Sequence, residues 1–147
     1  MQKVNDSPRR LARELVLKGL YAEDVSGIAA EDIIRSVVDD ESLSEKTLGF
    51  AHQLFRLVLQ HKEWADGHIS ALATNWDINR IANIDRNILR MAMVEIRDLP
   101  DTPVKVAINE AIELAKKFST AESSSFINGI LDKFARNFEL QQKPAAE

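Results

Sequence analysis

The sequence predicts an all-α protein of about seven helices. Its 147 residues include only five glycines and four prolines, while residue types that favour helices (Leu, Ile, Ala, Glu, Lys and Arg) are abundant. Apolar residues recur at helical spacing, and the strict alternation that marks strands is absent. The length corresponds to one domain of ordinary size.

Apolar periodicity and helix start signals place these elements at about residues 8–23, 30–38, 46–62, 64–74, 79–98, 104–118 and 120–138. Ser7 and Pro8 supply a cap and a proline for the first helix. Capping boxes of the form Ser-x-x-Glu, at residues 42–45 and 119–122, introduce the third and the last helix. The segment 79–98 is apolar nearly all round, with an interruption expected near Asn83.

The clearest element is VKVAINEAIELAKKF, residues 104–118. Thr102 and Pro103 are expected to supply its cap and first helical position. Glu113 precedes Lys117 by four residues, the favourable order for a helical ion pair. Its predicted core face consists of Val104, Ala107, Ile108, Ala111, Ile112, Ala115 and Phe118. These features predict a well-formed amphipathic helix.

Composition limits the class of protein. The chain has no cysteine, its N-terminus lacks the apolar segment of a signal peptide, and no stretch is long enough to span a membrane. We therefore expect a cytoplasmic protein without membrane contact. Residues 141–147 are expected to form a disordered tail.

Charge is distributed unevenly along the chain. The formal net charge is −4, which argues against a broadly basic nucleic-acid-binding surface. Residues 1–20, however, carry five basic side chains against two acidic ones, and residues 21–48 carry two basic against eight acidic. This asymmetry indicates either an anionic partner at the N-terminus or a solvated first helix.

The first helix combines basic side chains with one aromatic residue. Its predicted core side consists of Leu11, Ala12, Leu15, Val16, Gly19 and Ala22. Arg10, Glu14, Leu17 and Tyr21 share another side, with Arg13 and Lys18 at its flanks. Arginines beside an exposed tyrosine suit single-stranded RNA, because guanidinium groups contact phosphates and the ring offers a stacking surface. Alternatively, Tyr21 covers the edge of the core and the arginines pair with neighbouring acids.

The last helix has one aromatic residue off its core stripe. That stripe consists of Ile127, Ile130, Leu131, Phe134 and Phe138. Phe126 points about 100° from its centre, where another helix could cover it or where it could serve as a stacking surface. Gly129 costs about 1 kcal/mol relative to alanine in mid-helix. Either a close helix approach or contact with a partner would explain it.

Two acidic residues lie near the apolar side of the 79–98 segment. Its predicted core consists of Ile84, Ile88, Met91, Ala92 and Leu99, and its exposed strip of Arg86, Arg90 and Arg97. Asp85 and Glu95 would be costly there without partners. They either pair with internal arginines or cap backbone amides, or one of them marks a protein docking edge.

Signals for catalysis or metal binding are weak. His52, His61 and His68 are not joined by an acid or cysteine that would complete a metal set. No phosphate-binding glycine loop and no nucleophile–base arrangement is found. We therefore expect neither enzyme activity, nor a cofactor, nor a metal site.

Several segments together resemble the bacterial NusB family. The string VAINEAIELAKKFS and the segment FINGILD at 126–132 match its C-terminal half, and IDRNILR at 84–90 resembles its central helix. RRLARE at 9–14, followed by Leu20-Tyr21, resembles its arginine-rich opening. Leu11 stands where some members carry another arginine.

The resemblance implies an all-helical fold of two halves, here about residues 1–75 and 76–140. It implies transcription antitermination, notably on ribosomal RNA operons, through binding of boxA RNA together with NusE, a small-subunit ribosomal protein. The complex joins RNA polymerase and other Nus factors, and no bond is made or broken. Some members form homodimers that cover the RNA surface, so a homodimer stays an alternative here.

Residue by residue, the resemblance assigns RNA contacts to Arg9, Arg10, Arg13, Lys18, Tyr21, Glu122 and Phe126. It assigns Asp85 to the contact with NusE. Two other interpretations stay open. One is an RNA-binding domain fragment of a ribosomal RNA cytosine methyltransferase, and the other is a helical interaction module without an RNA role.

Overall fold

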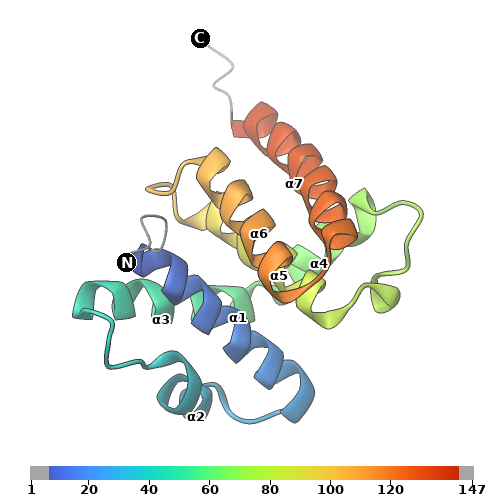
Figure 1. Cartoon of the computed structure of the whole chain (residues 1–147). Coiled ribbons are helices and arrows are strands. Elements are labelled where there is room, and N and C mark those ends of the chain that lie inside the picture. The colour runs from blue at the N-terminus through green and yellow to red at the C-terminus, as the bar shows by residue number, and fades with distance from the viewer. Residues whose placement is uncertain (1–6, 143–147) are drawn as a thin grey trace. The chain divides into compact units, whose positions relative to one another are not determined.

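The computed structural model describes residues 7–142, and their side chains as far as residue 139. Within this range every regular element is helical, which confirms the all-α prediction (Figure 1). The elements are α1 (Pro8–Ser26), α2 (Ala30–Ile33), the π-helical turn η1 (Ile34–Val38), α3 (Glu45–Gln60), α4 (Lys62–Leu72), the 3₁₀ turn η2 (Ile78–Arg80), α5 (Asn83–Asp98), α6 (Val104–Phe118) and α7 (Ala121–Gln142).

The chain divides into two compact units, unit 1 (Met1–Gln60) and unit 2 (His61–Glu147). This division falls between α3 and α4, whereas the resemblance placed it near residue 75. In unit 1, α1 packs against α3 and η1. In unit 2, α6 lies side by side with α7 and also packs against α5 (Figure 1). Each unit thus has its own helical core.

Helix α1 begins as predicted and ends later. The Ser7 hydroxyl accepts a hydrogen bond from the Arg10 amide at 3.1 Å, and Pro8 is the first helical residue. The helix continues to Ser26 because Gly27, at φ 71°, adopts the left-handed conformation that ends a helix at little cost for glycine.

The buried face of α1 differs from the predicted one. Ala12, Leu15, Val16 and Gly19 are buried as expected, but Leu17 is also buried and Leu11 is exposed. The reason is that α1 is covered by both α3 and η1, which widens its buried stripe. At Gly19 a methyl group would lie 3.1 Å from side-chain atoms of Phe55 and Val38, so this glycine permits the close approach.

Both predicted capping boxes are wrong by one or two residues. At α3 the Thr47 amide donates to the hydroxyl of Ser44, while Ser42 instead donates to the Asp40 carboxylate. At α7 the Ser123 amide donates to the Thr120 hydroxyl at 2.9 Å. In each case a second hydroxyl residue closer to the helix takes the capping position.

The α6 boundaries are as predicted, but its start differs in chemistry. Pro103 occupies the cap position itself, and no side chain supplies a capping bond there. Ala107, Ala111 and Ala115 of the predicted core face are buried, and Leu114 joins them. The predicted interruption near Asn83 is confirmed, since η2 ends at Arg80 and α5 begins at Asn83.

The arginines of α5 do not form the exposed strip that was predicted. Arg90 is buried and donates two hydrogen bonds to the Asp66 carboxylate, at 2.7 and 2.8 Å. Arg97 bonds Asp98, and Arg86 donates to the Ile78 carbonyl. The predicted exposed strip is wrong because neighbouring segments pack on this side of α5 and supply hydrogen-bond acceptors for Arg86 and Arg90.

At the C-terminal end, α7 continues through Gln142, so the prediction of a disordered tail is wrong for residues 141 and 142. The remainder of that predicted tail, residues 143–147, lies outside the described residues, as do Lys3 and Asp6 of the N-terminal charge count. Among the described helices, none is long and apolar enough to cross a membrane.

Candidate nucleic-acid interface

The basic residues predicted on α1 differ in how far they reach solvent. Lys18 is exposed, Arg10 is half-buried, and the Tyr21 side chain is 42% exposed. Arg13 is only 4% exposed, contrary to its expected place at the flank of an exposed face. Lys18 and Tyr21 are therefore the most accessible of the predicted RNA-contacting groups on this helix.

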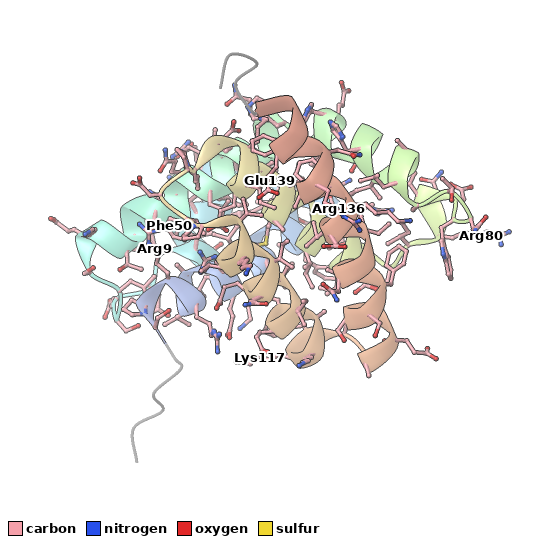
Figure 2. The ribbon with its side chains drawn as sticks, turned by 90° about the horizontal axis from the view of Figure 1, so that it is seen from above. Arg9, Phe50, Arg80, Lys117, Arg136 and Glu139 are labelled. Carbon is pink, nitrogen blue, oxygen red and sulfur yellow. The ribbon has the colours of Figure 1, made fainter. Side chains whose placement is uncertain are left out.

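Arg9 and Arg13 share one aromatic partner in unit 1. Their guanidinium carbons lie 4.3 and 5.2 Å from the centre of the Phe50 ring, which α3 supplies. Figure 2 labels Arg9 and Phe50, which lie close together. The negative face of an aromatic ring attracts a cation. Phe50 thereby orients two of the predicted RNA-contacting arginines, a role that no sequence pattern indicated.

Several acidic side chains of residues 21–48 are paired within unit 1. Arg56 donates to Glu31 at 2.5 Å, and this hydrogen bond lowers the pKa of the Glu31 carboxyl and raises that of Arg56. Arg35 pairs with Asp32, and His52 with Asp39. The acidic segment is thus partly paired with basic side chains of its own unit.

In unit 2 the structure brings three predicted residues together. Asp85, Glu122 and Phe126 line one open cavity of about 560 Å³, although the sequence places the first nearly forty residues from the others. Trp76 and Arg80 are among the other residues that line it. The cavity thus combines aromatic rings, one cation and two carboxylates.

Asp85 lies in the first turn of α5, where the positive end of the helix dipole favours a carboxylate. It is 6% exposed, and one of its oxygens accepts a hydrogen bond of 2.7 Å from the Ser123 hydroxyl. The other oxygen has no hydrogen-bond partner among the described residues. Asp85 is therefore held by Ser123 of α7. Pairing with an internal arginine, one of the two structural roles considered for it, is not found among the described residues.

Phe126 is half-buried and packs edge-to-face against Trp76, with ring centres 5.6 Å apart. Trp76 is 56% exposed. No role was predicted for it from the sequence, because it lies in an irregular connection without periodicity. Its only sequence signal is the presence of a large aromatic residue among polar neighbours.

Of the two explanations for Gly129, close packing of another helix is wrong. A methyl group at this position would have no atom of another described helix within 4 Å. Gly129 instead borders a second hollow of about 240 Å³, which also touches Trp76 and Phe126.

The histidines have local partners. His52 contacts Asp39, His61 lies 3.7 Å from Asp98, and the His68 ring packs against Trp64 and Phe134. Across the described part of the chain, no cluster of three His, Cys, Asp or Glu residues has the arrangement of a metal site.

Comparison with known proteins identifies consistent relatives. A family model described as the NusB family matches residues 10–136. The chain is 42% identical over 128 residues to the transcription antitermination protein NusB of Dehalococcoides mccartyi, covering 87% of this chain and 90% of that protein.

Solved structures agree with this match. The structure of NusB from T. maritima has a TM-score of 0.82 at 35% identity, covering 89% of this chain and 92% of that one. A structure of antitermination factors NusB and NusE in complex with double-stranded RNA shares the fold, with a TM-score of 0.79 at 23% identity and coverage of 88% and 97%.

Proposed function

Because this chain belongs to the NusB family, we propose that it is a transcription antitermination factor that acts on ribosomal RNA operon transcripts. It binds boxA-type single-stranded RNA together with ribosomal protein NusE. The assembly then joins RNA polymerase and other Nus factors. Its contribution is recognition and scaffolding, with no chemical step.

The observation that carries this proposal is the cationic, tyrosine-bearing surface of α1. Lys18 and Tyr21 are exposed and Arg10 is half-exposed, so a phosphate and an unpaired base can reach them. Arg9 and Arg13 lie over Phe50, which restricts where their N–H groups point. In unit 2, Glu122 and Phe126 provide an acceptor and a ring for further RNA contacts.

We assign Asp85 to the contact with NusE. One of its carboxylate oxygens is buried without a hydrogen-bond partner among the described residues, and a donor from a protein partner would satisfy it. Asp85→Lys should weaken NusE association, measured by calorimetry, while helical content stays near that of the unmodified protein. Ser123→Ala is the control, because it removes the internal hydrogen bond and keeps the carboxylate. Unfolding of Asp85→Lys together with loss of stability in Ser123→Ala would assign Asp85 a purely structural role.

Two alternatives are less well supported. A methyltransferase fragment is less favoured because the relative with 42% identity over 128 residues is an antitermination protein. A helical interaction module without an RNA role predicts that the cations of α1 are dispensable for binding.

The proposal is tested by titrating a labelled boxA-type RNA with the protein, with and without NusE, at several salt concentrations. Three or four phosphate contacts on a single strand should produce a log–log salt slope of about −2 to −3. We expect NusE to strengthen binding and a scrambled RNA to lose it. Absence of binding both with and without NusE would reject the RNA role for the oligomeric state present in the experiment. Analytical ultracentrifugation would then show whether that state is a homodimer, which could cover α1.

A further inference from the structure

Trp76 is a large apolar side chain held at the surface of unit 2. It lies in the connection between α4 and η2, and its backbone amide donates to the Ala73 carbonyl at 3.0 Å. The Asp77 carboxylate next to it accepts from the Asn79 amide at 2.9 Å, which stabilises the turn. The backbone on both sides of the indole is therefore fixed, while Trp76 itself is 56% exposed.

Two hollows share this tryptophan and Phe126. The larger, about 560 Å³, lies within the range of about 300–1,000 Å³ typical of small-ligand sites, and the smaller, about 240 Å³, lies below it. The two rings meet edge-to-face, at an interplanar angle of 62°, so each keeps at least one face that the other does not cover. Gly129 leaves the smaller hollow open, because it places no side chain there.

Each hollow has one cationic side chain in its lining. Arg80 borders the larger and points away from the ribbon of unit 2 in Figure 2. Lys133, on α7, borders the smaller. Thr74, Asn75 and Ser125 add hydroxyl and amide groups to the smaller hollow. Single-stranded nucleic acid alternates bases, which stack on aromatic rings, with phosphates, which bind cations. The two rings with one cation beside each hollow provide both kinds of contact.

We propose that Trp76 and Phe126 separate two unpaired bases of single-stranded RNA, one in each hollow, with Arg80 and Lys133 contacting the adjoining phosphates. This inference rests on the proposed RNA-binding function and extends it by Trp76, Arg80 and Lys133. Stacking accepts any base, since every base has an aromatic face. Specificity at this point would come from the Glu122 carboxylate, which accepts hydrogen bonds from base amino groups.

RNA suits this surface better than a protein segment does. A protein docking patch is expected to have an apolar centre free of charge. Here the exposed charged side chains Arg80 and Glu122 line the larger hollow, and Lys133 lines the smaller. A protein partner is accordingly an outcome that the experiment must distinguish.

Intrinsic fluorescence provides a direct test, because the chain has only two tryptophans. The other is Trp64, whose ring centre lies 4.0 Å from the guanidinium carbon of Arg97. Its ring also packs edge-to-face against Phe134. Trp64→Phe leaves Trp76 as the sole reporter, and Trp76→Phe leaves Trp64. We expect unlabelled boxA-type RNA to quench the first variant and to leave the second unchanged.

Affinity provides an independent test. Trp76→Ala should weaken binding of fluorescein-labelled boxA-type RNA by about fivefold to 150-fold, the range for loss of a stacked base. Val106→Ala is the matched control, because Val106 is 41% exposed in the same unit and lines neither hollow. Arg80→Gln and Lys133→Gln should each reduce the magnitude of the salt slope by about 0.7, the value for one phosphate contact on a single strand. Arg136→Gln, an exposed cation elsewhere on α7, should leave it unchanged.

The outcomes separate this inference from the function on which it rests. RNA binding by the unmodified protein, together with unchanged affinity in Trp76→Ala and no quenching of Trp76, would overturn the inference and leave the proposed function standing. Unchanged RNA affinity with weakened NusE binding in Trp76→Ala would overturn it and assign the hollows to a protein partner. Failure of the unmodified protein to bind RNA would overturn both.

Discussion

At the scale of single residues, two glycines in helices serve opposite purposes. Gly19 lies where α1 meets Phe55, Val38 and Ile33, and a methyl group there would be 3.1–3.2 Å from their atoms. Gly129 lies in α7, and a methyl group at this position would have no atom of another described helix within 4 Å. Gly19 permits close helix packing, whereas no described contact of unit 2 requires a glycine at position 129.

This contrast predicts opposite effects of the same substitution. Gly129→Ala should raise the free energy of unfolding by about 0.5–1 kcal/mol, because alanine loses less backbone entropy in a helix. Gly19→Ala should lower it by about 1–3 kcal/mol through overpacking. Denaturant titration followed by circular dichroism measures both changes. A destabilised Gly129→Ala would show that this part of α7 is more crowded than the structure indicates.

At the scale of elements, the short α2 is tied to α3 by an ion pair. Arg56 of α3 donates two hydrogen bonds to Glu31 of α2. The pKa of Glu31 is lowered below its ordinary value of 4.5, chiefly by the hydrogen bond from Arg56. Both side chains are exposed, so the pair contributes little to stability, but its pH dependence has a definite sign.

Since the carboxylate form is favoured in the folded protein, the contribution of Glu31 is present above pH 4.5 and is lost as pH falls through the lowered pKa. Glu31→Gln should therefore have a slightly lower Tm than the unmodified protein at neutral pH, and the difference should vanish in acid. As a control, Glu41→Gln removes a charge from the same acidic segment without breaking a described ion pair. A difference in Tm that persists in acid would mean that Glu31 acts through packing.

The residue at which each helix starts also depends on contacts between neighbouring elements. Ser42 and Ser119 are the caps predicted for α3 and α7, but Ser44 and Thr120 hold these positions instead. Neighbouring hydroxyl residues have nearly equal capping propensity, so the packing of the preceding turn determines which one bonds the backbone.

At the scale of the whole molecule, the proposed function places an anionic ligand on a chain of net charge −4. Binding must therefore depend on where the cations lie, because the total charge repels RNA. Lys18 on α1 and Lys46 on α3 are both exposed lysines of unit 1, and only Lys18 belongs to the proposed RNA surface.

Lys18→Glu and Lys46→Glu each replace one positive charge with one negative charge, which changes the net charge from −4 to −6. Lys18→Glu should reduce RNA affinity and lower the magnitude of the salt slope by about 0.7, whereas Lys46→Glu should change affinity far less. Titration of labelled RNA at several salt concentrations measures both. Equal losses in the two variants would indicate that only the overall charge matters, and would remove Lys18 from the site.

The helical class, the α6 boundaries and the residues that carry the family resemblance could all be read from residue order. They depend on local periodicity and on turn signals, which are properties of neighbouring residues in the chain. The core stripe of α7, including Ile127, Leu131 and Phe134, was predicted for the same reason, and all three side chains are buried.

Which polar groups meet could not be read in this way and depends on tertiary packing. Packing buries Arg13 and Arg90, places Phe50 beneath two arginines, and joins Asp85 to Ser123 across 38 residues. It also brings Trp76 to Phe126. Helical periodicity determines the face on which a side chain lies, but the partner opposite that face is set by how helices distant in sequence pack together.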